Sequence, residues 1–195
     1  MLIKLVRPLR IGLKKQLSIY LIIVGTMFNI NLVYADYSCE GNLNDQIIED
    51  NIIVKTDKNC HLKNMTIKGN IALQENTGFS AHEITVEGDL IAVNYKQVNL
   101  THSQIQGNLA LQQGDSANIN NNRILGNLSA SKNKNSQLYT HNNIQGNLEV
   151  RQNMATATIR MNKIAGKLSC LNNRPSPVGR HNRAGNGKEG QCLRL

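Results

Sequence analysis

The sequence predicts an all-β fold, a parallel β-helix (β-solenoid) whose coils are 19 to 20 residues long. Three observations support this prediction: a short motif recurs at a nearly constant spacing, apolar residues alternate around it, and asparagine is abundant. Residues 36–195 contain 26 asparagines, a residue type that competes with helical hydrogen bonds and favours turns. An all-helical fold is therefore strongly disfavoured.

The first element along the chain is a predicted leader over residues 1–35. Residues 1–16 carry five basic residues and no acid, and an apolar stretch follows over residues 17–28. This order is typical of a secretory signal peptide and predicts cleavage after Ala35. An uncleaved membrane anchor is the alternative, but Asn29 interrupts an apolar run that is already short for a bilayer span.

Removal of the leader changes both the charge and the expected compartment. Five of the 22 Lys and Arg residues leave with it, so 17 remain against 13 acidic residues, and the net charge falls from +9 to +4. Residues 36–115 carry a net charge of −6, whereas residues 116–195 carry +10. We expect a bacterial protein that is secreted, periplasmic or on the cell surface, with no transmembrane segment after signal removal.

The repeat defines the next and largest element, a β-helix with its N-terminal cap over residues 36–171. The tripeptide Gly-(Asn/Asp/Lys)-(Ile/Leu) occurs six times, at spacings of 19, 19, 19, 20 and 20 residues. Its glycines are Gly69, Gly88, Gly107, Gly126, Gly146 and Gly166. Aliphatic residues two before and two after each glycine predict a strand, and a weaker alternation upstream predicts a second one. Units this short bury their apolar face only by stacking on identical neighbours.

Stacking turns sequence columns into physical ladders with a rise of about 4.8 Å per coil. The glycine column predicts a corner or a close backbone approach that a side chain would obstruct. Four residues before the glycines, Ser103 is followed by Asn122, Asn142 and Asn162, which predicts an amide ladder. The residue after each glycine, such as Asn108, is interpreted as a turn position that tolerates unusual backbone angles.

The cysteines predict two disulfides that staple the ends of the solenoid. All four lie after the leader, an even number in a chain routed to an oxidising compartment. Cys39 and Cys60 are 21 residues apart and Cys170 and Cys192 are 22 apart, about one coil each, so we predict these pairs. Zinc is disfavoured, because no CxxC pair is present. Residues 172–195 lack the repeat and are predicted to be an irregular basic C-terminal cap.

Together these features resemble uncharacterised secreted bacterial β-helix repeat proteins with Gly-Asn-aliphatic units. The resemblance lies in the opening Cys39-Glu-Gly-Asn-Leu, the glycine-centred units and the Gly187-Lys-Glu-Gly-Gln-Cys C-terminal end. It implies a single-stranded right-handed parallel β-helix and export, and it brings no established activity. The present chain differs in being unusually rich in asparagine and basic near its C-terminus.

Residues suited to catalysis are sparse on the units. Glu83, Glu87 and Asp89 would bind calcium only weakly, and Glu83 and His102 are expected ladder neighbours that would suit acid–base work. No nucleophile column and no long loop accompany them, so we predict no catalytic, metal-binding or cofactor-binding residue. A polysaccharide-active enzyme, a lyase or hydrolase of pectate-lyase-like fold, is the alternative function.

The residues favour a non-enzymatic surface or extracellular interaction module, or a structural one. The basic half predicts binding to polysaccharide or another anionic surface. The candidate contacts are Arg123, Lys132, Arg151, Arg160, Lys163 and Lys167. Nucleic acid is not expected, because a chain with few aromatic residues lacks stacking platforms. The opposite charges of the two halves also permit salt-sensitive self-association.

Overall fold

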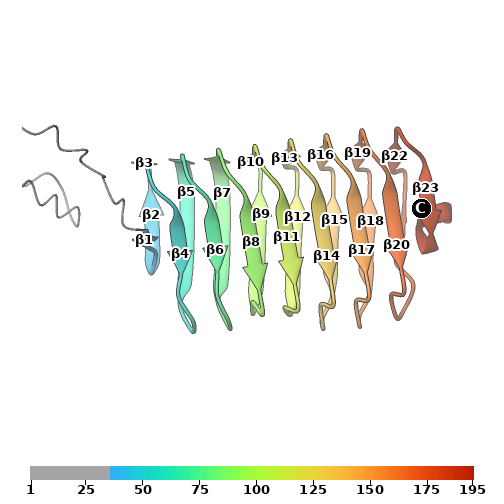
Figure 1. Cartoon of the computed structure of the whole chain (residues 1–195), viewed down its shortest axis with the longest axis horizontal. Helices are drawn as coiled ribbons and strands as arrows, with labels where there is room; N and C mark the ends of the chain where they lie inside the picture. Colours follow the sequence, from blue (N-terminus) through green and yellow to red (C-terminus); the bar gives the residue numbers. More distant parts are fainter. Residues whose placement is uncertain (1–35) are drawn as a thin grey trace, which may run out of the picture. The chain divides into compact units, whose positions relative to one another are not determined.

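The computed structural model describes residues 36–195, and the predicted leader lies outside the described residues. The chain winds into a parallel β-solenoid of about eight coils (Figure 1). Leu109 pairs with Leu128 and Leu128 with Leu148, so neighbouring strands are offset by 19 or 20 residues. The predicted all-β solenoid and its coil length are therefore confirmed.

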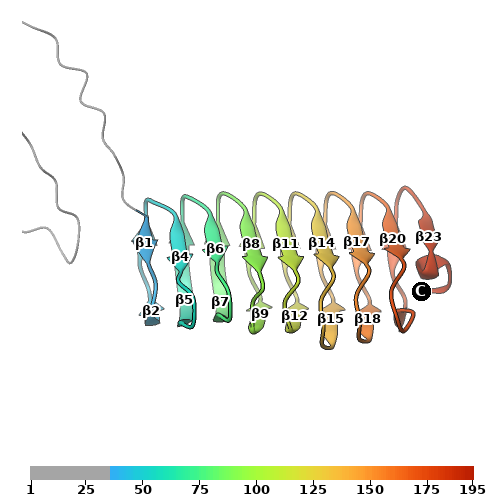
Figure 2. The same cartoon turned by 60° about the horizontal axis from the view of Figure 1, so that its bottom comes forward.

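One side of the solenoid is a nine-stranded parallel sheet, here called sheet A (Figure 2). Each coil contributes one strand to it, and consecutive coils lie side by side. In spatial order the strands are β1 (Tyr37–Ser38), β4 (Ile52–Val54), β6 (Ile71–Leu73), β8 (Leu90–Val93), β11 (Leu109–Gln112), β14 (Leu128–Ser131), β17 (Leu148–Arg151), β20 (Leu168–Leu171) and β23 (Lys188–Gly190).

A second, bent sheet supplies the other two faces. Face B comprises β2 (Gly41–Asn44), the first parts of β5 (Asn59–Ile67) and β7 (Gly78–Val86), β9 (Gln97–Thr101), β12 (Ser116–Asn120), β15 (Gln137–Thr140), β18 (Ala157–Arg160) and β21 (Val178–Arg180). Face C comprises β3 (Ile47–Ile48), the last parts of β5 and β7, β10 (Gln104–Ile105), β13 (Arg123–Ile124), β16 (Asn143–Ile144), β19 (Lys163–Ile164) and β22 (Arg183–Ala184).

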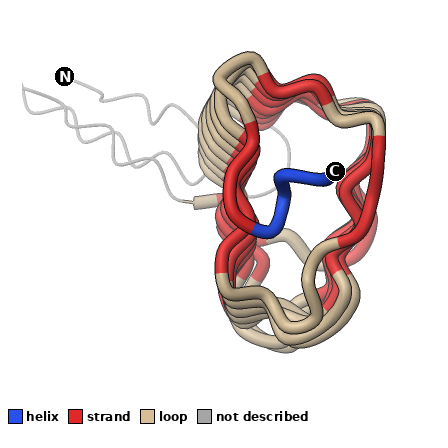
Figure 3. Tube along the Cα trace, turned by 90° about the vertical axis from the view of Figure 1, so that its right-hand side faces the viewer, coloured by secondary structure: helices blue, strands red, loops and turns tan. Residues whose placement is uncertain are grey.

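Three corners join the faces in every coil, and Figure 3 shows them in cross-section. Corner 1, between faces B and C, is a single residue with positive φ, such as His141 with φ 56°. Corner 2 is the loop that leads from sheet A to face B, for example residues 132–136. Corner 3 leads from face C back to sheet A, for example residues 125–127, and holds the repeat glycine.

Aliphatic side chains from all three faces fill the interior. Leu90, Leu109, Leu128 and Leu148 form one inward column of sheet A and are fully buried. Burial of each such side chain contributes about 1.5 to 3 kcal/mol. The period-2 alternation of the sequence therefore corresponds to alternation between core and solvent along each strand.

A small polar cluster interrupts this apolar core. Tyr95 donates its hydroxyl hydrogen to Asn133 Oδ1 at 3.0 Å, and Tyr139 donates to Gln137 Oε1 at 3.1 Å. Burial raises the pKa of both tyrosines above the ordinary value of 10.0. Gly114 leaves room for the Tyr95 ring, because a Cβ there would lie 2.3 Å from a ring carbon.

The predicted asparagine ladder is present at corner 1 and is buried. Asn142 Oδ1 accepts hydrogen bonds from the backbone and side-chain N–H groups of Asn122, at 3.0 and 3.2 Å. Asn142 Nδ2 donates to Ile119 O and to Asn162 Oδ1, at 2.8 and 3.0 Å. The ladder also extends to Asn182, in the segment predicted to be irregular. Each amide thus satisfies backbone groups that the corner would otherwise leave buried without partners.

Corner 3 confirms one expectation and corrects another. A Cβ on Gly126 would lie 2.5 Å from Gly107 O, so the glycines do permit a close backbone approach. The residues after them do not adopt positive φ, contrary to our interpretation of them as strained turn positions. They form an exposed ladder instead, in which Asn108 Oδ1 accepts hydrogen bonds from both N–H groups of Asn127.

The ends of the solenoid carry the predicted disulfides, Cys39–Cys60 and Cys170–Cys192. The segment after Asn172 differs from the expected irregular cap. Its strands β21, β22 and β23 pair in parallel with β18, β19 and β20 and so complete one more coil. Only the 3-10 helix η1 (Gln191–Arg194) and Leu195 leave the repeat, and η1 crosses the end of the solenoid in Figure 3.

Candidate functional site: a basic patch at corner 1

The six predicted polyanion contacts lie on three different parts of the surface. Arg123, Arg160 and Lys163 flank corner 1 and are exposed. Lys132 lies at corner 2, where it adopts a positive φ of 57°. Arg151 ends a strand of sheet A, and Lys167 lies at corner 3. The structure therefore brings together only the first three.

Two arginines that sequence reasoning did not select complete the corner-1 group. Arg160 pairs in register with Arg180, and Lys163 pairs in register with Arg183. Adjacent coils are about 4.8 Å apart, so four cationic side chains start from a two-by-two lattice of backbone positions. We call Arg123, Arg160, Lys163, Arg180 and Arg183 the corner-1 basic patch. Arg180 and Arg183 were missed because their segment was predicted to be irregular.

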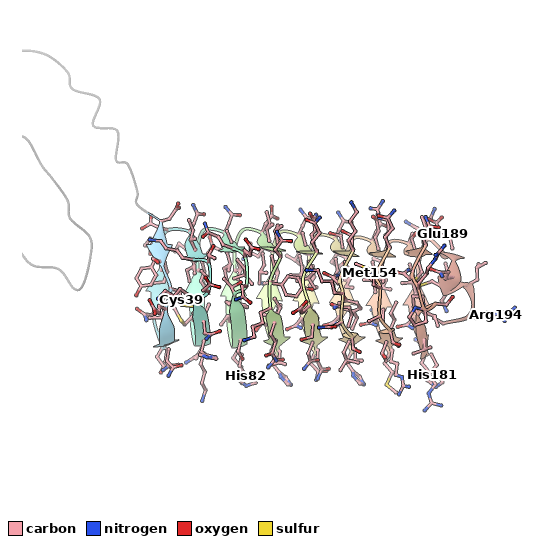
Figure 4. All side chains as sticks on the ribbon, turned by 90° about the horizontal axis from the view of Figure 1, so that it is seen from below. Cys39, His82, Met154, His181, Glu189 and Arg194 are labelled. Carbon is pink, nitrogen blue, oxygen red and sulfur yellow. A yellow bond between two sulfur atoms is a disulfide. The ribbon has the colours of Figure 1, made fainter. Side chains whose placement is uncertain are left out.

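The patch has no acidic counterpart in its half of the molecule. Residues 116–195 contain two acids, Glu149 and Glu189, and both lie on sheet A. Figure 4 shows Glu189 near one margin of the solenoid and His181, at corner 1, on the opposite margin. No ion pair forms at the patch among the described residues, and like charges opposite each other in a ladder repel.

The remaining predicted contacts on sheet A and corner 3 are already paired. Arg151 forms an ion pair with Glu149, and Lys167 Nζ lies 2.9 Å from Glu189 Oε2. Hydrogen bonds from Lys167 and Ser169 lower the pKa of the Glu189 carboxyl. Because an ion pair must be broken before an external anion binds, these two residues are poorer contacts than the patch.

A shallow groove runs along corner 1 next to the first half of face C. A hollow of about 430 Å³ is lined by Glu83, Ile84, Thr85, His102, Ser103, Gln104, Asn121 and Arg123. A second hollow of about 270 Å³ shares Glu83 and Thr85 with it. The groove therefore follows the solenoid axis over several coils and reaches the patch at Arg123.

Glu83 and His102 line the groove, but they lack the geometry of a catalytic pair. Glu83 Oε1 lies 3.7 Å from Nε2 of His82, and the rings of His82 and His102 meet edge to face at 5.2 Å. His82 Nδ1 is hydrogen-bonded to Thr101 Oγ1 at 2.9 Å. The described contacts give this cluster no activated nucleophile, so it is a polar surface cluster.

The three acids considered for calcium lie at different corners. Glu83 is at corner 1, whereas Glu87 and Asp89 are at corner 3, beyond the face C strand. Asp89 Oδ1 accepts hydrogen bonds from both N–H groups of Asn108, at 2.6 and 3.2 Å. Residues 36–195 contain no group of three His, Cys, Asp or Glu side chains placed to hold a metal ion.

The comparisons with known proteins add no family to these observations. No family model, no curated protein and no solved structure matches the chain. Within residues 36–195 no helix has the length and apolar character of a membrane span. The functional argument therefore depends on the surface chemistry of the solenoid itself.

Proposed function

We propose that the protein is a non-enzymatic interaction module of the bacterial periplasm, cell surface or exterior that binds acidic polysaccharide. The corner-1 basic patch supplies the contacts. The observation that carries this proposal is the in-register pairing of Arg160 with Arg180 and of Lys163 with Arg183, with no carboxylate beside them. Such a lattice stores repulsion that an external anion relieves.

The shape of the site favours an extended polymer over a small anion. The patch and the groove beside it both follow the solenoid axis, and equivalent side chains recur about every 4.8 Å. A linear chain of carboxylated or sulfated sugars placed along corner 1 meets hydroxyl and amide groups at Thr85 and Gln104 and cations from Arg123 onward. Repeated weak contacts of this kind add up along a polymer.

A matched pair of double variants tests the proposal. Lys163→Gln/Arg183→Gln removes one lysine and one arginine from the patch, and Lys167→Gln/Arg151→Gln removes the same charges from the ion-paired side. We expect the first variant to bind polygalacturonate or dextran sulfate at least about tenfold more weakly at low salt. The second should stay within about threefold of the wild type.

Two further readouts from the same samples separate the alternatives. New reducing ends or unsaturated sugars would identify a polysaccharide-active enzyme and redirect attention to Glu83 and His102. Sedimentation without polysaccharide reports salt-sensitive self-association between acidic and basic coils. Equal loss of binding in both double variants would contradict a specific role for the patch.

A further inference from the structure

Exposed apolar side chains gather at corner 2 of the last three coils. Eight large apolar side chains are exposed in residues 36–195, and four of them border these loops: Leu138, Met154, Leu171 and Val178. Met154 is 62% exposed, and Figure 4 shows it away from the margin that carries His82 and His181. Single exposed apolar residues are ordinary, but a group at one edge indicates an interaction surface.

The loops that carry this group are longer than those of the middle coils. Corner 2 has three residues in loops 94–96 and 113–115, five in loops 132–136 and 152–156, and six in loop 172–177. The buried ladder formed by Asn133, Asn153 and Asn173 holds the last three loops in register, with Asn133 N donating to Asn153 Oδ1 at 2.9 Å. The extra length is therefore presented on a fixed base.

Cationic side chains surround the apolar ones at this edge. Backbone hydrogen bonds place Lys134, Met154 and Arg174 at equivalent positions of successive loops, so the methionine lies between two basic residues. A hollow of about 490 Å³ there is lined by Lys132, Gln152, Asn153, Met154, Asn172 and Arg174. Every charged group in that lining is cationic, the amides add further donors, and no acid takes part.

We propose that this edge is a docking surface for an anionic lipid bilayer. We call it the corner-2 ridge and define it as Lys132, Lys134, Leu138, Met154, Leu171, Arg174 and Val178. Basic side chains around exposed apolar ones are the combination that binds at a membrane interface: the cations meet lipid phosphates and the apolar groups enter the headgroup region. The hollow beside Met154 accommodates one headgroup phosphate between Lys132 and Arg174.

The ridge and the corner-1 basic patch lie at opposite edges of face B. In the last coil, Val178 begins strand β21 at the ridge and Arg180 ends it at the patch. Side chains on the two edges therefore point to different surroundings, and lipid and polysaccharide binding are separable by substitution. The lipid proposal stands whether or not the patch binds polysaccharide.

Vesicle co-sedimentation tests the ridge, using phosphatidylcholine alone and an equal mixture with phosphatidylglycerol. Wild-type protein should sediment with the mixed vesicles and not with phosphatidylcholine. Met154→Ser should reduce that partition by about tenfold, because it removes the most exposed apolar group from the contact. Met161→Ser is the matched control, since Met161 is also exposed, at 45%, but lies at corner 1. It should behave as the wild type.

A second variant examines the charges. Lys132→Gln/Arg174→Gln should abolish sedimentation with the mixed vesicles, while Lys163→Gln/Arg183→Gln should retain it. Polysaccharide binding by Met154→Ser should equal that of the wild type. Failure of the wild type to sediment with anionic vesicles would overturn the proposal. Loss of sedimentation in the corner-1 variants with retention in the ridge variants would overturn it equally, because lipid would then bind at the patch.

Discussion

The two halves of the solenoid share one backbone path but close corner 1 with different side chains. In the third coil Ile84 fills the inward position, and strand β7 passes through the corner without a break. In the sixth coil Asn142 takes the equivalent position, and the strand divides into β15 and β16. Apolar packing and an amide ladder are thus two solutions to the same turn.

The halves also differ in how their charges are arranged. In the N-terminal half the few basic residues find acids: Lys58 Nζ lies 2.9 Å from Glu40, and Lys68 Nζ lies 3.0 Å from Glu49. In the C-terminal half the two acids are paired and the excess of basic residues is left for the surface. The comparison shows that a uniform repeat carries a graded surface, with the proposed contacts confined to the basic half.

Exchange of the inward residues at corner 1 gives the largest expected effect. Asn142→Leu places an aliphatic side chain where Ile84 has one, yet it removes the acceptor of the Asn122 N–H group and the donor to Ile119 O. We expect a loss of about 3 kcal/mol in the free energy of unfolding. The control Ile84→Leu should cost less than about 1.5 kcal/mol in guanidinium titrations. Similar costs for the two would mean that the halves are not stabilised differently.

Removal of each disulfide compares the two ends of the solenoid. Cys39→Ser/Cys60→Ser and Cys170→Ser/Cys192→Ser open loops with sequence separations of 21 and 22 residues. Each should lower the free energy of unfolding by about 3 kcal/mol, because the loops are nearly equal in length. Amide hydrogen exchange should increase mainly in the coil next to the opened end. Exchange that increases evenly over all coils would contradict end-stapling.

The buried tyrosines at the junction of the halves predict a loss of stability at alkaline pH. Burial raises the pKa of Tyr139 well above 10.0, so above that pH the unfolded chain releases the phenolic proton and the folded chain keeps it. The free energy of unfolding therefore falls as pH rises. Tyr139→Phe should cost about 1 kcal/mol at neutral pH, through its lost hydrogen bond to Gln137, and should fall less steeply above pH 10. Identical slopes for wild type and variant would contradict this.

The smallest effects concern surface charge, and the halves should respond with opposite signs. Lys68→Gln removes a partner of Glu49, whose hydrogen bond raises the pKa of Lys68, so it should slightly destabilise the fold. Arg180→Gln removes a like charge beside Arg160, so it should leave stability unchanged or slightly raise it. Thermal melts at low and high salt measure both. Destabilisation by Arg180→Gln that disappears at high salt would mean that the patch has an internal counter-ion.

The repeat was predictable from sequence because each column of the solenoid is a column of the alignment of its own coils. The buried corner-1 ladder and both disulfides follow from spacing alone. The corner-2 ladder was missed although Asn133, Asn153 and Asn173 each lie seven residues after a repeat glycine. Its signal was weak, because Gly114 and Tyr95 replace asparagine in the preceding coils.

The last coil was missed for a physical reason. Its motif is Gly185-Asn186-Gly187, which keeps the glycine and asparagine but has no aliphatic residue at the third position. Pro175 and Pro177 fall in the corner-2 loop, outside the strands, where they interrupt no ladder. Charge pairing was equally hidden, since Lys167 and Glu189 become neighbours only when this last coil stacks on the one before it.

Mapping of ligand contacts on the folded protein tests the central claim most directly. Amide chemical shifts of the wild type would be followed during titration with an acidic oligosaccharide such as oligogalacturonate. We predict shifts concentrated at Arg160, Lys163, Arg180 and Arg183, weaker shifts along the groove toward Thr85, and none on sheet A. Shifts centred on sheet A, or none anywhere at low salt, would contradict the assignment of corner 1 as the binding surface.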